Sequence, residues 1–419
     1  MGVTTAFRLL AGLVSFSIVA RLLGPENFGV LMFWFSVAML LALVTNYGLT
    51  PYVLREIGAH PDSAKHLIAE GLAGKLVLTV AVIVVAAGYL IGWKPESGLT
   101  FVLLLVAGVA DSFSEFLNAG LRAAGRFDVE TKVATVGAVA NILIVSSLVF
   151  LFPSVDAAAL AYGLARIFVL ILTGWAVSKY FGRLRASSLK SGVGLVGRVS
   201  NYAIDFGFQS LFGQIDSVFL NYFVGPVGVG LHQAGMRVYQ GGAQAATVLS
   251  NVFLPRSASM MQDGQAGFKA ENTRIQLVFI AIGFVFGGIV SLLAKPIVLI
   301  LFGSSYIALA SLLSLFGILF FVRMFASAWG VVLTAAGMQS FRAWVGFFHW
   351  VAVSGLAVVL VPVYGNRGWL FVLIFSSLLM GTAYASRAAS LVSRPASVFV
   401  ITGGGLAILV LLCFSLVSV

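Results

Sequence analysis

Thirteen long apolar stretches, most of them above twenty residues, constrain the fold of this chain more than any other feature of its sequence. An α-helix needs about 20 mostly apolar residues to cross the hydrocarbon core of a bilayer. None of the stretches alternates apolar and polar residues as a membrane β-barrel does. The sequence therefore predicts an all-α polytopic membrane protein with helices near residues 3–23, 27–50, 67–92, 99–122, 129–151, 157–179, 198–223, 227–254, 272–294, 307–334, 341–361, 367–390 and 398–418.

The scarcity of charge excludes soluble enzyme folds for most of the chain. Charged residues make up 9% of it and hydrophobic residues 60%, whereas soluble domains carry about 25% charged residues. The single cysteine, Cys413, excludes a disulfide framework, and the four histidines are not spaced as metal ligands. The sequence shows neither a Ser-His-Asp set nor a long aqueous loop, so nothing in it indicates a hydrolase. We therefore expect neither an enzyme nor a bound cofactor or metal.

The basic residues predict the orientation in the membrane. If the N-terminus is cytoplasmic, most of the 25 lysines and arginines fall on or near the inner side, which is the usual bias of cytoplasmic loops. The first apolar run lacks a small-residue cleavage site, so we expect it to be retained as a helix. The net charge of +11 thus reflects topology and contact with membrane lipids. Nucleic acid is not an expected partner, because no basic patch is interleaved with stacking aromatics.

Two short motifs recur in the two halves of the chain. Residues 24–29 (GPENFG) match residues 225–230 (GPVGVG) at an offset of 201, and residues 123–126 (AAGR) match residues 335–338 (AAGM) at an offset of 212. These matches pair the first six predicted helices with the next six in the same order. Because six is even, both halves have the same orientation, which predicts a parallel repeat of two pseudo-symmetric six-helix lobes.

The repeat also predicts the domain boundaries. Two-lobed architectures of this kind belong to transporters that expose a cavity to one side of the membrane at a time. The longest inner connection is basic and lies near the middle of the chain, where a linker between lobes is expected. The predicted parts are an N-terminal lobe (1–179), a basic cytoplasmic linker (180–197), a C-terminal lobe (198–390) and one additional C-terminal transmembrane helix (391–419).

Two glycine motifs have plain structural interpretations. Residues 192–197 match the G-x-G-x-x-G pattern of dinucleotide-binding loops, but that function requires a preceding strand, and here the segment joins membrane helices. Gly283 and Gly287 form a G-x-x-x-G pair. We expect this pair to allow close helix packing within the bundle rather than dimerisation.

Several segments resemble a known family of membrane proteins. They are ARLLGPENFGVL (20–31), IDSVFLNYFVGPVGVGLHQAG (215–235), ILFGSSYIALASLLSLF (300–316), LTAAGMQSFRAWV (333–345) and LVPVYGNRGW (360–369). Together they are similar to the polysaccharide-transporter family, the Wzx-type O-antigen and exopolysaccharide flippases of the multidrug/oligosaccharidyl-lipid/polysaccharide exporter superfamily. The resemblance extends from about residue 8 to residue 390.

This resemblance implies a function and its setting. The expected protein is a flippase of the bacterial inner membrane that moves undecaprenyl-pyrophosphate-linked oligosaccharide from the cytoplasmic to the outer leaflet by alternating access. Polysaccharide polymerase and chain-length proteins are then expected partners in surface polysaccharide biosynthesis. Two alternatives stay open: an exporter of small cationic drugs from the same superfamily, and a non-transporting assembly partner in the envelope. A cation exporter would favour carboxylates in its cavity, whereas a carrier of pyrophosphate would favour arginines.

Deep arginines and a polar stripe are the predicted substrate-binding groups. An ionisable side chain inside the membrane usually faces a cavity or a charged partner, and arginine donates paired hydrogen bonds to phosphate. The helix predicted over 227–254 also carries a polar stripe at spacings of four, three and four, which is unsuited to lipid. The predicted residues are Arg166, Arg237, Arg323, Gln209, Gln233, Gln240 and Gln244.

Four carboxylates are predicted to couple transport to a proton or Na⁺. Asp111 and Glu115 are four residues apart and share a helix face. Asp205 and Asp216 are eleven residues apart, about three turns, and lie near one face as well. The alternative is that deep charges simply pair, for example Asp111 with Arg166, or Asp216 with Arg237, and hold helices together.

Overall fold

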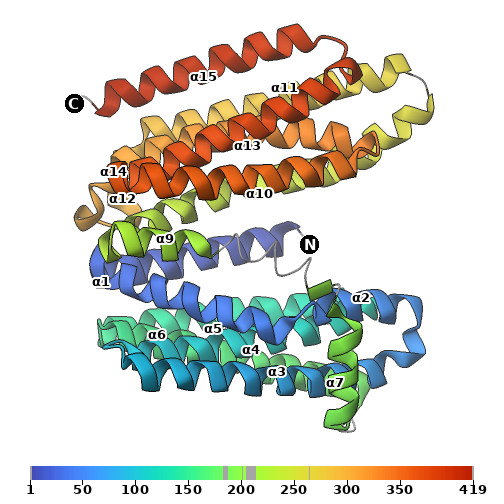
Figure 1. The fold of residues 1–419 in the computed structure, drawn as a ribbon, viewed down its shortest axis with the longest axis vertical. Helices are drawn as coiled ribbons and strands as arrows, with labels where there is room; N and C mark the ends of the chain where they lie inside the picture. Colours follow the sequence, from blue (N-terminus) through green and yellow to red (C-terminus); the bar gives the residue numbers. More distant parts are fainter. Residues whose placement is uncertain (1, 183–186, 201, 204–213, 264, 418–419) are drawn as a thin grey trace. The chain divides into compact units, whose positions relative to one another are not determined.

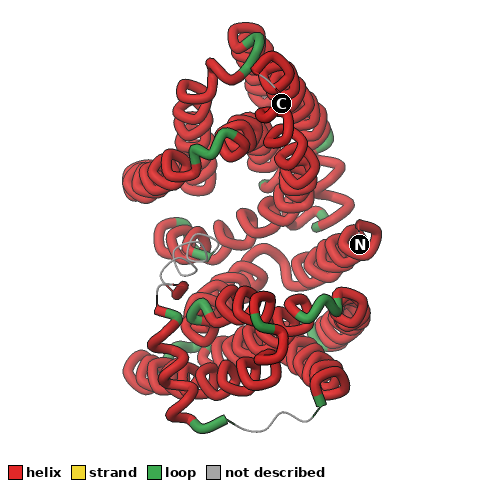
Figure 2. The backbone as a smooth tube through the Cα atoms, turned by 90° about the vertical axis from the view of Figure 1, so that its right-hand side faces the viewer, coloured by secondary structure: helices red, strands yellow, loops and turns green. Residues whose placement is uncertain are grey.

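The structure is a computed structural model that describes residues 2–417 except 183–186, 201, 204–213 and 264. Across these ranges the chain is helical, and no strand occurs (Figures 1 and 2). The α-helices are α1 (Gly2–Asn46), α2 (Leu49–Ala59), α3 (Ala64–Trp93), α4 (Gly98–Ala123), α5 (Phe127–Leu151), α6 (Val155–Phe181), α7 (Leu189–Arg198), α9 (Ile215–Phe223), α10 (Pro226–Asp263), α11 (Gln265–Leu292), α12 (Ala294–Leu301), α13 (Leu309–Ala335), α14 (Gln339–Ala388) and α15 (Pro395–Val417).

Two of these helices, α1 and α14, each combine two helices that the sequence predicts separately, with a break in the backbone between them. Gly24 in α1 has φ 72° and ψ 169°, and Gly365 in α14 has φ 56° and ψ −135°. Such backbone angles are open to glycine and break the helical path. Both breaks fall between helices that the sequence predicts separately. In the described part of the chain, nine segments are long and apolar enough to span a membrane, with each joined pair counted once.

Three short helices and the position of one proline differ from the helix boundaries that the sequence predicts. The sequence predicts no separate helix at α2, α7 or α12, and α7 occupies the end of the segment predicted as a linker. Pro255 lies inside α10, whereas the sequence predicts that the helix ends before it. Contacts beyond the proline hold the helix: Arg256 pairs with Glu271 at 2.9 Å, and Ser257 donates to Asn272 at 2.7 Å. These contacts to α11 offset the lost backbone hydrogen bond.

The repeat that the sequence predicts is present in the backbone of the turns. Gly125 and Gly337 have φ of 71° and 73° and follow the ends of α4 and α13. The same hydrogen bond closes both turns, from Arg126 N to Leu121 O at 2.9 Å and from Met338 N to Leu333 O at 2.8 Å. This bond is typical of a helix that ends at a left-handed glycine.

Side chains bridge these two turns at equivalent positions. Arg122 donates to Glu130 at 2.9 Å in the first half, and Arg342 donates to Thr334 in the second half. Each bridge joins residues eight apart, and the two pairs are offset by the same 212 residues as the AAG motifs. The chemistry differs, but the same turn is closed in the same way twice.

The change in offset between the halves has a structural explanation. The starts of α3 (Ala64) and α11 (Gln265) are 201 residues apart, whereas the ends of α4 (Ala123) and α13 (Ala335) are 212 apart. The second half contains α12 between the two helices, and the first half has only a short connection at the same place. The helix α12 is therefore an insertion into the second copy of the repeat.

The chain divides into two compact units, residues 1–222 and 223–419. In the first, α2, α3, α4, α6 and α7 share a core of buried apolar residues that includes Val53, Ile68, Phe116 and Leu195. In the second, α11 and α13 share a core that includes Phe279, Phe320 and Met324. The domain boundary predicted at 180–197 stays a prediction, because much of the helix expected to begin the second lobe lies outside the described residues.

The glycine pair in α11 permits the close helix crossing expected from the sequence. A Cβ atom added at Gly287 would lie 2.7 Å from the carbonyl oxygen of Gly317 in α13, and one added at Gly283 would lie 3.0 Å from Met324. We expect Gly287→Ala to destabilise the protein by about 1–3 kcal/mol, because the backbones must separate. Gly288→Ala is the matched control, since its nearest contact would be Leu409 at 4.0 Å. Thermal unfolding in detergent measures the difference, and equal midpoints for the two variants would contradict it.

Candidate functional site

A pocket within the first unit brings together charged residues from four helices. It has a volume of about 360 Å³ and is lined by α1, α4, α5 and α6. The polar lining comprises Arg8, Asp111, Ser114, Glu115, Asn118, Asn141 and Arg166. Two basic and two acidic groups thus share one space with amide and hydroxyl groups. Three of the predicted site residues, Asp111, Glu115 and Arg166, lie there together.

The closest charged contact in this pocket joins α4 to α6. Arg166 Nη1 lies 2.9 Å from Asp111 Oδ1, and the two side chains are 37% and 42% exposed. Both groups line the polar pocket rather than an apolar core. The pair is one of the two that the sequence offers as a structural alternative. A proton or cation that reached Asp111 would compete directly with Arg166.

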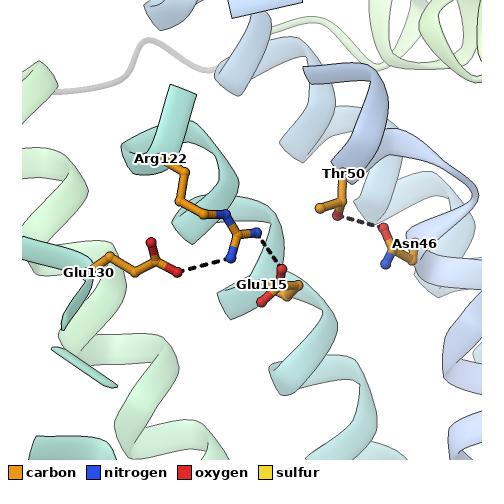
Figure 3. Close-up of polar contacts among 5 residues, drawn as sticks. All are labelled: Asn46, Thr50, Glu115, Arg122 and Glu130. Carbon is orange, nitrogen blue, oxygen red and sulfur yellow. Dashed lines mark hydrogen bonds and ion pairs between the residues drawn. The ribbon is translucent and has the colours of Figure 1, made fainter. Parts of the chain in front are cut away.

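Glu115, one turn along α4 from Asp111, has a different partner. Arg122 lies between Glu115 and Glu130 and contacts both (Figure 3). The Arg122 to Glu130 distance is 2.9 Å. Because Arg122 is shared between two carboxylates, Glu115 is joined to the turn that connects α4 to α5. Sequence reasoning placed Arg122 only by topology, although its distance of seven residues from Glu115 puts both on one helix face.

The polar stripe lies on the side of α10 that its own unit leaves uncovered. The opposite side packs into the core, with Gly235 against the ring of Phe316 and Gly242 against Phe286 and Phe320. The stripe itself is less covered: Gln233 and Arg237 are half-buried, and Gln240 and Gln244 are exposed. The small residues of α10 thus serve packing, and the exposed members of the stripe are Gln240 and Gln244.

Arg323 occupies the position in the second unit that Asp111 occupies in the first. Asp111 lies twelve residues before the end of α4, and Arg323 lies twelve residues before the end of α13. Arg323 is half-buried. Equivalent positions of the repeat thus carry opposite charges. The first unit holds a carboxylate there and the second a guanidinium.

The remaining predicted site residues are Asp205, Gln209 and Asp216. Asp216 is buried at the first turn of α9, and its Oδ1 accepts a hydrogen bond from the backbone N–H of Ser217 at 2.7 Å. Asp205 and Gln209 lie outside the described residues. Their predicted roles stay predictions.

Sequence reasoning missed a buried lysine. Lys75 in α3 is completely buried, and its Nζ donates to the carbonyl oxygen of Thr45 at 2.9 Å and to Ser112 at 2.7 Å. Thr45 lies at the end of α1, and the chain then turns through Tyr47 and Gly48, with φ of 41° and 68°. Lys75 therefore supplies hydrogen bonds to a helix end whose carbonyls lack intrahelical partners.

A second repeat in α3 and α11 carries buried carboxylates that the sequence analysis also missed. Residues 69–77 (AEGLAGKLV) and 270–278 (AENTRIQLV) share their first two residues and their final Leu-Val at an offset of 201. Glu70 pairs with Arg198 at 2.7 Å, as Glu271 pairs with Arg256. Glu70 also accepts from Ser191 of α7 at 2.7 Å. These pairs attach neighbouring helices to α3 and α11, so we interpret them as structural.

Comparison with known proteins identifies related sequences and folds. The family described as polysaccharide biosynthesis protein matches residues 2–261. No curated protein matches the chain.

Solved transporter structures share the fold of this chain. The lipid II flippase MurJ in an inward closed conformation gives a TM-score of 0.73 at 12% identity, covering 98% of this chain and 91% of that one. An inward-facing multidrug resistance transporter of the MATE family gives 0.69 at 16% identity, covering 92% and 95%. A MOP superfamily transporter from Pyrococcus furiosus gives 0.57 at 14%, covering 93% and 95%. At these identities the likeness establishes the two-lobed fold.

Proposed function

This chain belongs to the polysaccharide biosynthesis protein family, and on that basis we propose that it flips undecaprenyl-pyrophosphate-linked oligosaccharide across the bacterial inner membrane. Its fold is that of multi-pass membrane transporters, including a lipid flippase. The proposal includes alternating access, a cytoplasmic N-terminus, and polysaccharide polymerase and chain-length proteins as partners. Surface polysaccharide such as O-antigen would be the product that the flipped units build.

The observation that carries this proposal is the distribution of positive charge in the second unit. Arg323 stands where the first unit has a carboxylate, and the half-buried Arg237 lies on the same stripe of α10 as three glutamines. Guanidinium groups bind pyrophosphate through paired hydrogen bonds, and glutamines can bond sugar hydroxyls. We assign Arg237, Arg323, Gln233, Gln240 and Gln244 to substrate binding.

We assign ion coupling to the pocket of the first unit. There Arg166 lies 2.9 Å from Asp111, which supports a role for Arg166 in coupling; its predicted role in substrate binding stays a prediction. Binding of a proton or Na⁺ at Asp111 would release Arg166 and loosen the link between α4 and α6. Such a switch needs an ion to reach the pair, and both Asp111 and Arg166 line the pocket.

Export of small cationic drugs is the second candidate function. The observation that favours it is the same pocket, because Asp111 and Glu115 offer two carboxylates to a cation. Arg166 and Arg122, however, already neutralise them. The arrangement therefore favours ion coupling over the binding of a drug.

A flipping assay in proteoliposomes tests the proposal. Defined undecaprenyl-pyrophosphate glycans would be incorporated in the vesicles, and their appearance in the opposite leaflet measured with and without proton or Na⁺ gradients. We expect flipping that a gradient accelerates, and no efflux of cationic dyes by the same preparation. Dye efflux without flipping of any glycolipid would refute the flippase assignment and support the drug exporter.

A further inference from the structure

A groove on the first unit has the composition of a lipid-binding site and shares one lining residue, Val133, with the charged pocket. It is formed by α5 and α6 and has a volume of about 490 Å³. One end is lined by Arg126, Asp128, Lys132 and Lys179, and the rest is lined mainly by apolar and aromatic side chains. Three basic groups against one carboxylate leave this end with an excess of positive charge.

The charged end is organised by contacts with aromatic rings. The guanidinium of Arg126 lies 4.7 Å from the ring centre of Tyr180, and Lys179 Nζ lies 5.1 Å from that of Trp175. Arg126 also forms two hydrogen bonds with Asp128, at 2.9 and 3.0 Å. The acidic group is thus occupied by Arg126, which leaves the charges of Lys132 and Lys179 to attract an anion.

The apolar part of the groove continues along both helices for about two turns. Val129, Val133 and Val136 recur on one face of α5, and Leu172 and Ala176 line the groove from α6. A surface that is cationic at the helix ends and apolar toward the middle matches an amphiphile with an anionic head. The aromatic residues Trp175 and Tyr180 lie where such rings mark the boundary between headgroups and hydrocarbon.

We propose that this groove binds one anionic phospholipid of the inner leaflet, with its phosphate between Lys132 and Lys179 and an acyl chain along Val133, Val136 and Leu172. Basic pockets between transmembrane helices on the cytoplasmic side are suited to anionic lipid headgroups. A lipid held there would occupy the groove between α5 and α6. The groove contains none of the substrate residues and neither member of the coupling pair. The choice of the inner leaflet rests on the proposed cytoplasmic N-terminus, whereas lipid binding itself can be tested without any flippase activity.

Binding of phosphatidylglycerol to the purified full-length protein in detergent tests this site. Native mass spectrometry would count retained lipid, with phosphatidylethanolamine as the zwitterionic comparison and inorganic phosphate as competitor. For Lys132→Ala combined with Lys179→Ala we expect binding of phosphatidylglycerol to weaken roughly thirtyfold, since each basic residue contributes about a fivefold gain. Lys65→Ala combined with Lys190→Ala is the matched control, because both lysines are exposed and lie outside the groove.

A second variant tests the apolar part without changing any charge. Val136→Trp would fill the groove, so we expect it to lose phosphatidylglycerol while keeping the fold, as judged by an unchanged elution volume and melting temperature. Several results would overturn the proposal: equal retention of the two phospholipids, equal binding by the two double variants, or unchanged binding by Val136→Trp. Displacement of the lipid by inorganic phosphate alone would also overturn it, since the site would then be an ion site.

Discussion

Replacing Arg237 and Arg323 together by alanine is expected to lower the rate of glycolipid flipping by about a hundredfold or more. A hydrogen bond to a charged group contributes about 1.5–3 kcal/mol, and each 1.4 kcal/mol corresponds to about a factor of ten. The two arginines lie on α10 and α13, and neither belongs to the apolar cores of its unit. The measurement is the initial flipping rate in proteoliposomes at matched protein density.

Controls for the arginine prediction separate local contact from net charge. Arg274→Ala with Arg387→Ala removes the same charge from exposed positions on α11 and α14, and this variant should flip normally. Arg237→Lys with Arg323→Lys keeps the charge but loses the planar fork, so we expect an intermediate rate. Full activity of the double alanine variant would eliminate both residues as substrate ligands.

Asp111→Asn is expected to abolish the response of transport to an ion gradient while flipping down a substrate gradient persists. Asparagine keeps the size of the side chain but removes the negative charge that Arg166 holds at 2.9 Å. The pair can then no longer be broken and re-formed by a proton or Na⁺. The measurement compares flipping with and without each gradient. The ratio of the two rates should fall to about one.

A matched variant makes the coupling prediction specific. Asp62→Asn removes a carboxylate from the short helix at Pro61–Ser63, away from the pocket, and should leave the gradient response intact. Arg166→Gln frees Asp111 from its partner, so we expect gradient coupling to be altered without loss of substrate binding. A gradient response that survives Asp111→Asn would place ion coupling elsewhere, and Asp205 and Asp216 would be the next residues to replace.

The sequence predicts the helices and the repeat because these depend on local patterns. Apolar length defines a membrane helix, and Gly24 and Gly365 break the chain where the sequence places connections. Pro255 shows the limit of local reasoning, since a contact between Arg256 and Glu271 sustains the helix around it. Such a contact joins residues whose proximity depends on how α10 packs against α11.

The candidate site is predicted only in part for the same reason. The spacing of Asp111 and Glu115 places them on one face, and the sequence offers Arg166 as one possible partner of Asp111. The contact itself depends on how α4 packs against α6, and the sharing of Arg122 between Glu115 and Glu130 depends on the turn between α4 and α5. Lys75 is the clearest omission. Its hydrogen-bond partners, Thr45 and Ser112, are 30 and 37 residues away, so a lysine that counts as a topological signal in the sequence is a buried helix cap in the structure.

Because positions 111 and 323 are equivalent but carry opposite charges, each position can serve as the control for substitutions at the other. The two residues lie at the same distance from the end of equivalent helices, so the same side chain can be introduced at both in one scaffold. Exchanging the two residues, with Asp111→Arg and Arg323→Asp, tests whether the role of each half depends on the charge at this one position or on the surrounding residues of the lobe. Under the proposed assignment, selecting the cargo and receiving the driving ion would fall on two equivalent positions of one repeated fold.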